Sequence, residues 1–384
     1  MRTILLISPY WKEDRRWMVS SVKLAELWQR LGYRVAVACM GAETSIEEVS
    51  DTLTIYRKKD LFLPDPWNYG IAPGFTGLVR RVIAMEKPDV IIVNKILFWT
   101  SFSMISLRAR GTLRAGGIPA LVLTDALVGM TWWGRTFLFR LVSRIYAWTL
   151  GWLILRCADR IVFFHPQPER LLKFLGVAGK MRVIPTGIDV ARYSFSRSLD
   201  LKNEQRATSK QVTMTYVGRL ESVKGVDDFL AAAVPLKKQF PQMKIQVVGW
   251  YRHGHPLVVQ YRCDVHFTGL RDDIPAILAA TDIFVLPSHS EGLSNALMEA
   301  MASGCACVAT EVGGNSFLLQ NGISGFLFPP GDREALLSHL RRLLDDPAKR
   351  RSLGEAARAR IEKQFSWAVV GELYRHLFEE VLKN

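Results

Sequence analysis

The sequence predicts an α/β protein with two domains, each built on a mostly parallel β-sheet. The chain has 384 residues, whereas a single hydrophobic core stops growing at about 250–300 residues. Short β-branched runs alternate with amphipathic stretches from end to end, which is typical of βαβ units. The alternation pauses at the polar stretch 191–210 and then restarts, so this stretch is the predicted linker.

The strands and helices follow from this alternation in chain order. Before the linker, the predicted strands are residues 4–7, 35–38, 90–93, 120–123 and 160–164, and the predicted helices are 17–31 and 134–155. After it, the predicted strands are 213–217, 244–248, 264–267, 283–286 and 305–309. The predicted helices there are 224–239, 274–280, 295–303, 332–344, 348–364 and 366–382. In two such sheets, ligands bind beyond the carboxyl ends of the strands, so we expect the site in a cleft between the domains.

Composition excludes several classes of protein. Hydrophobic residues make up 49% of the chain and charged residues 22%, which argues against disorder, collagen and coiled coil. The five cysteines form no C-x-x-C pair, so we expect a reducing compartment and no structural zinc. We expect no membrane-spanning segment, because the apolar run 145–155 is bracketed by Arg144 and Arg156 and is too short. We expect no signal peptide, because the first apolar run is only four residues long and the acidic Glu13 and Asp14 follow it.

Charge is concentrated in the first half of the chain. The net charge is +14, of which residues 1–192 carry +12, and nine of the eleven tryptophans lie there as well. Arginine together with tryptophan favours an anionic membrane surface. A nucleic-acid partner and a merely solvated basic surface are the alternatives, and we expect no nucleic acid.

The segment most informative about chemistry is P-S-H-S-E-G-L-S-N-A-L-M-E-A-M-A-S-G at residues 287–304. It follows a predicted strand and opens a predicted helix, whose N-terminus is suited to phosphate. Alone, Glu291 and Glu299 would be read as a helix cap and a surface residue. However, Y-V-G-R-L-E-S-V-K-G at 216–225 places Arg219 and Lys224 after another strand, and such cations suit a diphosphate. V-G-G follows at 312–314.

With these motifs the chain resembles the retaining glycosyltransferases of family 4, the group 1 type with the GT-B fold. The resemblance is most specific between Arg156 and Phe328. It implies that Glu291 contacts the donor sugar and Glu299 the ribose. It further implies that the last helix, about 366–384, packs back on the N-terminal domain 1–190, and that residues 211–365 form the donor domain. The remaining implied donor contacts are the diphosphate-binding Arg219 and Lys224 with Gly218, the backbone at Gly292, Leu293, Ser294 and Asn295, and the nucleobase-flanking Leu270 and Arg271.

The first half departs from the family pattern at two places. The loop after the first strand, residues 8–21, lacks the family's Gly-Gly, and its Arg15 and Arg16 would bind either phosphate or an anionic acceptor. Where the family often has a histidine, this chain has Asp125, which is either an active-site residue or a helix N-cap. The catalytic residues expected are therefore Glu291 and Asp125.

The predicted function is transfer of a hexose-type sugar from a nucleotide-diphosphate donor, with retention and without a metal or other cofactor. A UDP-sugar is the favoured donor and GDP-mannose the alternative. The acceptor expected is lipid-linked or a polysaccharide of the cell envelope. The alternatives are a nucleotide-sugar 2-epimerase of the same fold and a non-catalytic subunit.

A peripheral location on the inner face of the cytoplasmic membrane is expected through residues 132–156. As a helix, this segment brings Trp133, Phe137 and Leu141 near Arg140 and Arg144 on one side, with Arg135 as a further cation. The alternative is that this helix belongs to the core, and exposure or burial of Trp132 and Trp133 separates the two.

Overall fold

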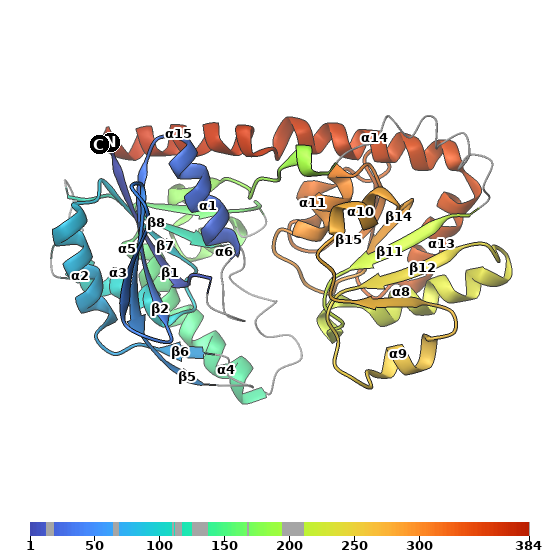
Figure 1. Ribbon diagram of the computed structural model, residues 1–384, viewed down its shortest axis with the longest axis horizontal. Helices are drawn as coiled ribbons and strands as arrows, with labels where there is room; N and C mark the ends of the chain where they lie inside the picture. Colours follow the sequence, from blue (N-terminus) through green and yellow to red (C-terminus); the bar gives the residue numbers. More distant parts are fainter. Residues whose placement is uncertain are drawn as a thin grey trace. The chain divides into compact units, whose positions relative to one another are not determined.

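Figure 1 shows the computed structural model of the protein, which describes residues 1–12, 19–63, 69–109, 111, 117–124, 137–166, 169–193 and 211–383. The described residues form two units. Unit 1 holds those up to Thr186 and again from Val370, and unit 2 holds Gly187–Val369. The sequence analysis placed these limits at residues 190 and 366.

Unit 1 contains an eight-stranded sheet in the order β10-β9-β8-β7-β1-β2-β4-β3. Its pairings are parallel except that β3 runs antiparallel to β4. The strands are β1 (Thr3–Tyr10), β2 (Arg34–Gly41), β3 (Ser45–Ser50), β4 (Leu53–Lys59), β7 (Val90–Asn94), β8 (Ala120–Thr124), β9 (Arg160–Phe163) and β10 (Met181–Val183), and a separate hairpin pairs β5 (Leu61–Leu63) with β6 (Tyr69–Ile71). The helices are α1 (Val19–Arg30), α2 (Phe75–Glu86), α3 (Phe102–Ala109), α4 (Phe137–Tyr146), α5 (Trp152–Cys157) and α6 (Glu169–Phe174).

The last helix, α15 (Trp367–Leu382), packs on α1 of unit 1, as Figure 1 shows. The fully buried Trp28 ring meets Tyr374 edge-on at a centroid distance of 5.6 Å. Glu380 forms ion pairs with Arg160 at 2.7 Å and with Arg182 at 2.5 Å. The C-terminal helix is thus fixed to unit 1 by both apolar burial and charge.

Unit 2 contains a parallel six-stranded sheet in the order β13-β12-β11-β14-β15-β16. This is the doubly wound order, and its connections change direction between β11 and β14. The strands are β11 (Thr213–Val217), β12 (Lys244–Val248), β13 (His266–Gly269), β14 (Ile283–Leu286), β15 (Ala306–Thr310) and β16 (Phe326–Phe328). The helices are α8 (Val226–Ala233), α9 (Pro256–Tyr261), α10 (Ile274–Ala279), α11 (Asn295–Ala302), α12 (Asn315–Leu318), α13 (Arg333–Asp345) and α14 (Pro347–Gln364).

Two long predicted helices are interrupted in the structure. The one predicted at 134–155 changes to a π-helical turn at Ala147–Gly151, where the Thr149 hydroxyl donates to the Ile145 carbonyl at 2.7 Å. The one predicted at 224–239 begins only at Val226, because Gly225 has the left-handed φ of 61°, and it becomes a 3₁₀ turn (Val234–Lys238) that contains Pro235. The sequence analysis had also missed the strands β3, β4, β5, β6, β10 and β16.

Candidate active site

Three loops of unit 2 come together at the carboxyl ends of neighbouring strands. They follow β11, β14 and β15, and they carry Lys224, Glu291 and Gly313, respectively. The first two loops flank the point where the strand order reverses, which is where doubly wound sheets bind their ligands. The sheet therefore brings together residues that lie far apart in the sequence.

Lys224 and Glu291 form a buried ion pair at this point. Lys224 Nζ lies 2.7 Å from Glu291 Oε1, and the two side chains are only 13% and 6% exposed. The Ser288 hydroxyl donates to the same carboxylate oxygen at 2.7 Å. A charge buried this deeply requires such partners, so the carboxylate is held in one place.

Glycines allow the three loops to approach one another closely. Gly225 has φ +61°, and a Cβ built on it would lie 2.1 Å from the Pro287 carbonyl oxygen. Gly313 has φ +53°, and its Cβ would lie 2.0 Å from the Glu291 carbonyl oxygen. Any side chain at these positions would push the loops apart, because the obstacle in each case is backbone.

Helix α11 begins directly after the Glu291 loop. The Ser294 hydroxyl caps it by accepting from the Leu297 N–H at 3.3 Å. Gly292 and Ser294 are buried, Leu293 is half-buried and Asn295 is exposed. The half-buried Glu299 lies further along this helix and hydrogen-bonds to the side chain of Tyr193. Burial and the neighbouring Glu299 carboxylate raise the pKa of Tyr193, a residue that the sequence analysis missed.

The two predicted donor arginines make ion pairs within their own loops. Arg219 is 60% exposed and lies 2.9 Å from Glu221, so it pairs with a carboxylate of its own loop. Arg271 pairs with Asp273 at 2.6 Å. Gly218 donates its N–H to the Val248 carbonyl at 2.8 Å, which joins the β11 loop to the end of β12.

An exposed apolar pair follows the next two strands of the sheet. Trp250 follows β12 and is 48% exposed, and Leu270 follows β13 and is 76% exposed. Val248 pairs with Gly269 in the sheet, so the two side chains follow neighbouring strand ends. Trp250 was missed in the sequence analysis, although an indole directly after a strand end was a usable signal.

Among the residues that the structure describes, one cluster has the composition of a metal site. Asp227, Asp228 and His289 offer three potential ligand atoms within 4.8 Å of one another. The Arg333 guanidinium also hydrogen-bonds to Asp228 at 2.5 Å. A protein cation already neutralises this carboxylate, so the cluster is explained as an ion-pair network.

In unit 1 the corresponding edge of the sheet is polar. The Asn94 amide donates to the Ser21 hydroxyl at 2.5 Å, and Ser21 contacts the Ser8 hydroxyl at 2.8 Å; all three residues are fully buried. This network joins β1, α1 and β7. The predicted residues Arg15, Arg16 and Asp125 lie outside the described residues, as do Trp132, Trp133 and Arg135.

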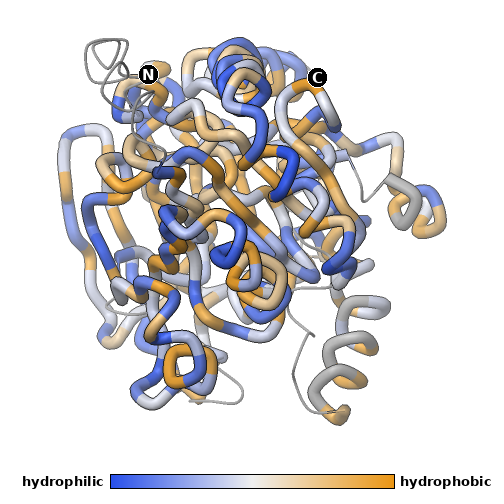
Figure 2. Tube along the Cα trace, turned by 90° about the vertical axis from the view of Figure 1, so that its right-hand side faces the viewer, coloured by the Kyte–Doolittle hydropathy of each residue, from blue (hydrophilic) through white to orange (hydrophobic). Residues whose placement is uncertain are grey.

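Helix α4 of unit 1 presents apolar side chains to solvent, and its described residues appear largely hydrophobic at the lower right of Figure 2. Phe137 is 74% exposed and Leu141 is 43% exposed. The other exposed apolar side chains of this segment are Leu138, Val142, Ile145, Trp148 and Leu150. No helix within the described ranges combines the length and apolar content that a membrane-spanning helix needs. Nothing is described of the side chains of Arg140 and Arg144.

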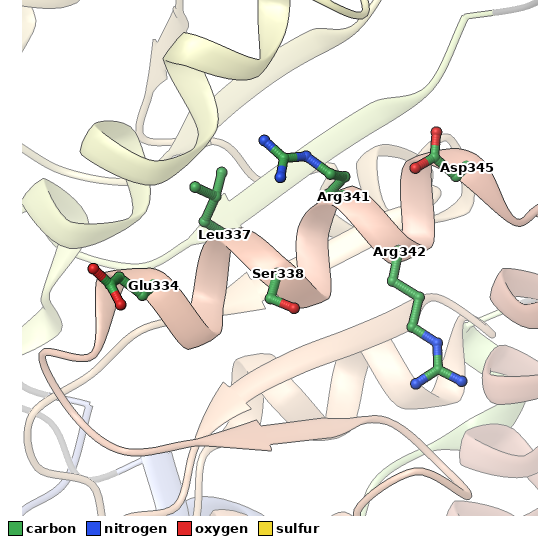
Figure 3. Close-up of a pocket in the computed structure, with 6 residues that line it drawn as sticks. All are labelled: Glu334, Leu337, Ser338, Arg341, Arg342 and Asp345. Carbon is green, nitrogen blue, oxygen red and sulfur yellow. The ribbon is translucent and has the colours of Figure 1, made fainter.

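A surface hollow on α13 does not belong to this site. Figure 3 shows that its lining side chains all come from that one helix, and Arg341 and Arg342 point to different sides of it. The lining residues are Glu334, Leu337, Ser338, Arg341, Arg342 and Asp345. Since no second element contributes, the polar groups do not converge on a common point.

Comparisons with known proteins point to one family. Residues 19–192 match the family model described as Glycosyltransferase Family 4, and residues 211–346 match the one described as Glycosyl transferases group 1. A UDP-Gal:alpha-D-GlcNAc-diphosphoundecaprenol alpha-1,3-galactosyltransferase of Escherichia coli is 28% identical over 283 residues, or 69% of either chain. Glycogen synthase of Mycobacterium tuberculosis is 30% identical over 228 residues, which are 57% of this chain and 53% of the relative. The matches thus span between about half and two thirds of these relatives.

Solved structures resemble the chain over nearly its whole length. Sucrose-phosphate synthase from Thermosynechococcus elongatus gives a TM-score of 0.75 at 23% identity and covers 99% of this chain and 100% of its own. Anabaena HepE, solved in complex with UDP, has a TM-score of 0.74 at 19% identity, and the match again covers 99% of this chain and 100% of the HepE chain. These likenesses confirm the predicted fold.

Proposed function

The chain belongs to the family 4 glycosyltransferases, which have the GT-B fold, and from this premise we propose that it is a retaining hexosyltransferase with a nucleotide-diphosphate sugar as donor. A UDP-sugar is the favoured donor and GDP-mannose the alternative. The observation that carries the proposal is the buried Lys224–Glu291 pair at the point where the strand order reverses.

In this proposal Lys224 and the N-terminus of α11 stabilise the departing diphosphate. An ammonium group and aligned backbone N–H groups both act where negative charge develops, so the step needs no metal ion. Arg219 contributes once its local pair with Glu221 opens. Charge stabilisation in a site of low exposure is worth far more than in water.

Glu291 contacts the donor sugar but does not act as a nucleophile. Its Oε1 already accepts from Lys224 and Ser288, and a carboxylate stabilised in this way is a weak nucleophile. A front-side attack by the acceptor hydroxyl is therefore favoured over the two-carboxylate scheme of retaining glycosidases.

The remainder of the nucleotide extends along neighbouring strand ends. Glu299 accepts hydrogen bonds from the ribose hydroxyls, and Tyr193 orients its carboxylate. Trp250 and Leu270 flank the base, because an exposed indole provides a stacking surface for any nucleobase.

We propose a lipid-linked or envelope-polysaccharide acceptor that binds unit 1, with Asp125 as a catalytic group and Arg15 and Arg16 as anion-binding side chains. The Escherichia coli relative is named for a diphosphoundecaprenol acceptor. The first half of the chain carries most of the positive charge, and helix α4, which belongs to this half, exposes apolar side chains. Together these features support peripheral attachment to the inner face of the cytoplasmic membrane.

Product analysis by NMR tests the proposed reaction. The purified protein, incubated with a UDP-hexose and a lipid extract, should give a glycosylated lipid with the anomeric configuration of the donor. Conversion of the donor alone into its 2-epimer would instead indicate the epimerase. Failure to use any sugar nucleotide, with or without acceptor, would favour the non-catalytic subunit.

Vesicle co-sedimentation tests the membrane attachment. Wild-type protein should pellet with anionic vesicles, pellet less at high salt, and bind neutral vesicles weakly. Replacing the exposed Phe137 and Leu141 by serine should reduce the bound fraction. Equal recovery with both vesicle types, unaffected by salt, would contradict the attachment.

A further inference from the structure

His289 links the two loops that carry Lys224 and Glu291. Its ring Nε2 lies 3.3 Å from Asp228 Oδ2, at the start of α8 just after the Lys224 turn. His289 itself stands two residues before Glu291, on the loop that follows β14. One imidazole thus joins the beginning of α8 to the loop that holds the sugar-binding carboxylate.

Asp228 is held from a third element. This residue is only 5% exposed, and its Oδ1 accepts from Arg333 Nε at 2.5 Å. Arg333 is the first residue of α13, so the carboxylate joins α13 and α8 to His289. A buried carboxylate with a guanidinium on one oxygen and an imidazole on the other has little freedom to move.

The backbones of the same two loops are also in direct contact. The His289 N–H donates to the Val223 carbonyl at 2.8 Å. A Cβ on Gly225 would lie 2.1 Å from the Pro287 carbonyl oxygen and 3.4 Å from His289 Nε2. Lys224 stands between Val223 and Gly225, so both of its chain neighbours contact the His289 loop.

We propose that His289 is a positioning residue for donor binding, which acts through Lys224. With Asp228 and Arg333 it locks the Lys224 turn against the Glu291 turn, so that the ammonium and the carboxylate face the donor at a fixed separation. This inference rests on the proposed role of Lys224 in binding the donor diphosphate. Small displacements of a binding group reduce the rate of catalysis steeply. A network that prevents such displacements of Lys224 therefore affects how well the donor is used.

Substitutions at His289 test the proposal. His289→Leu removes the Nε2 contact with Asp228, whereas His289→Gln retains an N–H donor at that distance. We expect the leucine variant to lose on the order of ten- to a hundred-fold in donor kcat/KM and to bind UDP correspondingly more weakly. The glutamine variant should recover most of this loss, which a purely steric role of the ring would not explain.

His339→Leu is the matched control. This histidine lies on α13 of the same unit and stacks on Phe326 at a centroid distance of 4.5 Å. Its replacement should lower the melting temperature without changing the affinity for UDP. If His289→Leu does not fold, Asp228→Asn tests the same network, since the amide keeps the shape but removes the charge. Unchanged UDP affinity in the folded variant would overturn the proposal.

A double-mutant cycle separates this proposal from the diphosphate assignment. In a Lys224→Ala background, His289→Leu should cause little further loss of UDP affinity, because the two residues act as a unit. Independent losses that multiply would contradict positioning through Lys224. If Lys224→Ala alone leaves UDP binding intact, the diphosphate assignment is wrong. If only His289→Leu has no effect, the diphosphate assignment stands and the positioning role is wrong.

Discussion

Replacement of Lys224 by alanine separates two consequences of the buried pair. The two side chains are 13% and 6% exposed, so the change leaves Glu291 as a buried charge that keeps the Ser288 hydroxyl as a donor. Breaking a buried ion pair costs about 3–5 kcal/mol. Because the Ser288 hydroxyl still donates to Glu291, we expect the free energy of unfolding to fall by about 3 kcal/mol, the low end of this range. The lost contact to phosphate costs roughly 1.5–3 kcal/mol, which weakens donor binding about ten- to a hundred-fold.

Urea denaturation and UDP titration measure the two effects separately. Adding Glu291→Gln to Lys224→Ala removes the orphaned charge, so it should restore part of the stability but none of the affinity for UDP. Lys237→Ala is the control, because Lys237 also forms an ion pair within unit 2, at 3.7 Å from Asp264. It should lose less than about 1 kcal/mol and no affinity. Unchanged UDP binding by the Lys224→Ala variant would refute the reasoning.

Three further outcomes are expected. Glu291→Gln should lower kcat, whereas Glu299→Gln should mainly raise the Kd of the nucleotide; equal UDP binding by wild type and Glu299→Gln would contradict the ribose role. Trp250→Ala should weaken binding of UDP but not of inorganic diphosphate, since stacking on a base is worth about 1–3 kcal/mol, and equal losses for both ligands would contradict base stacking. Arg182 and Arg160 lower the pKa of Glu380. The stability from these two ion pairs is therefore present above the pKa of an unfolded glutamate and is lost as the pH falls through the lower folded pKa. Urea denaturation of Glu380→Gln should show reduced stability at neutral pH and less change on acidification than wild type.

Local sequence signals placed the strands that carry the candidate donor loops, but not every helix start. The helix predicted from Lys224 begins only at Val226, because Gly225 adopts a left-handed φ. Strand lengths were predicted within a few residues where the apolar runs were long. The three-residue strands β5, β6, β10 and β16 are too short to show a period that could identify them.

Contacts between residues that lie far apart in the sequence could not be predicted from the sequence. His289 contacts Asp228 only because β11 and β14 are neighbours in the sheet, and strand order cannot be read from single strands. For the same reason the pairing of Tyr193 with Glu299 gave no sequence signal. The motif around Arg219 predicted a phosphate-binding side chain, but it did not show that this arginine forms an ion pair with Glu221 in the structure.

A thermal-shift comparison of nucleotides tests the central claim most directly, namely that unit 2 binds a nucleotide diphosphate through Lys224. A ligand at 100 times its Kd stabilises the folded protein by about 2.7 kcal/mol. UDP or GDP should therefore raise the melting temperature by several degrees, the corresponding monophosphate should raise it much less, and Lys224→Ala should remove most of the difference. Equal shifts for mono- and diphosphates, or no shift with any nucleoside diphosphate, would contradict the account.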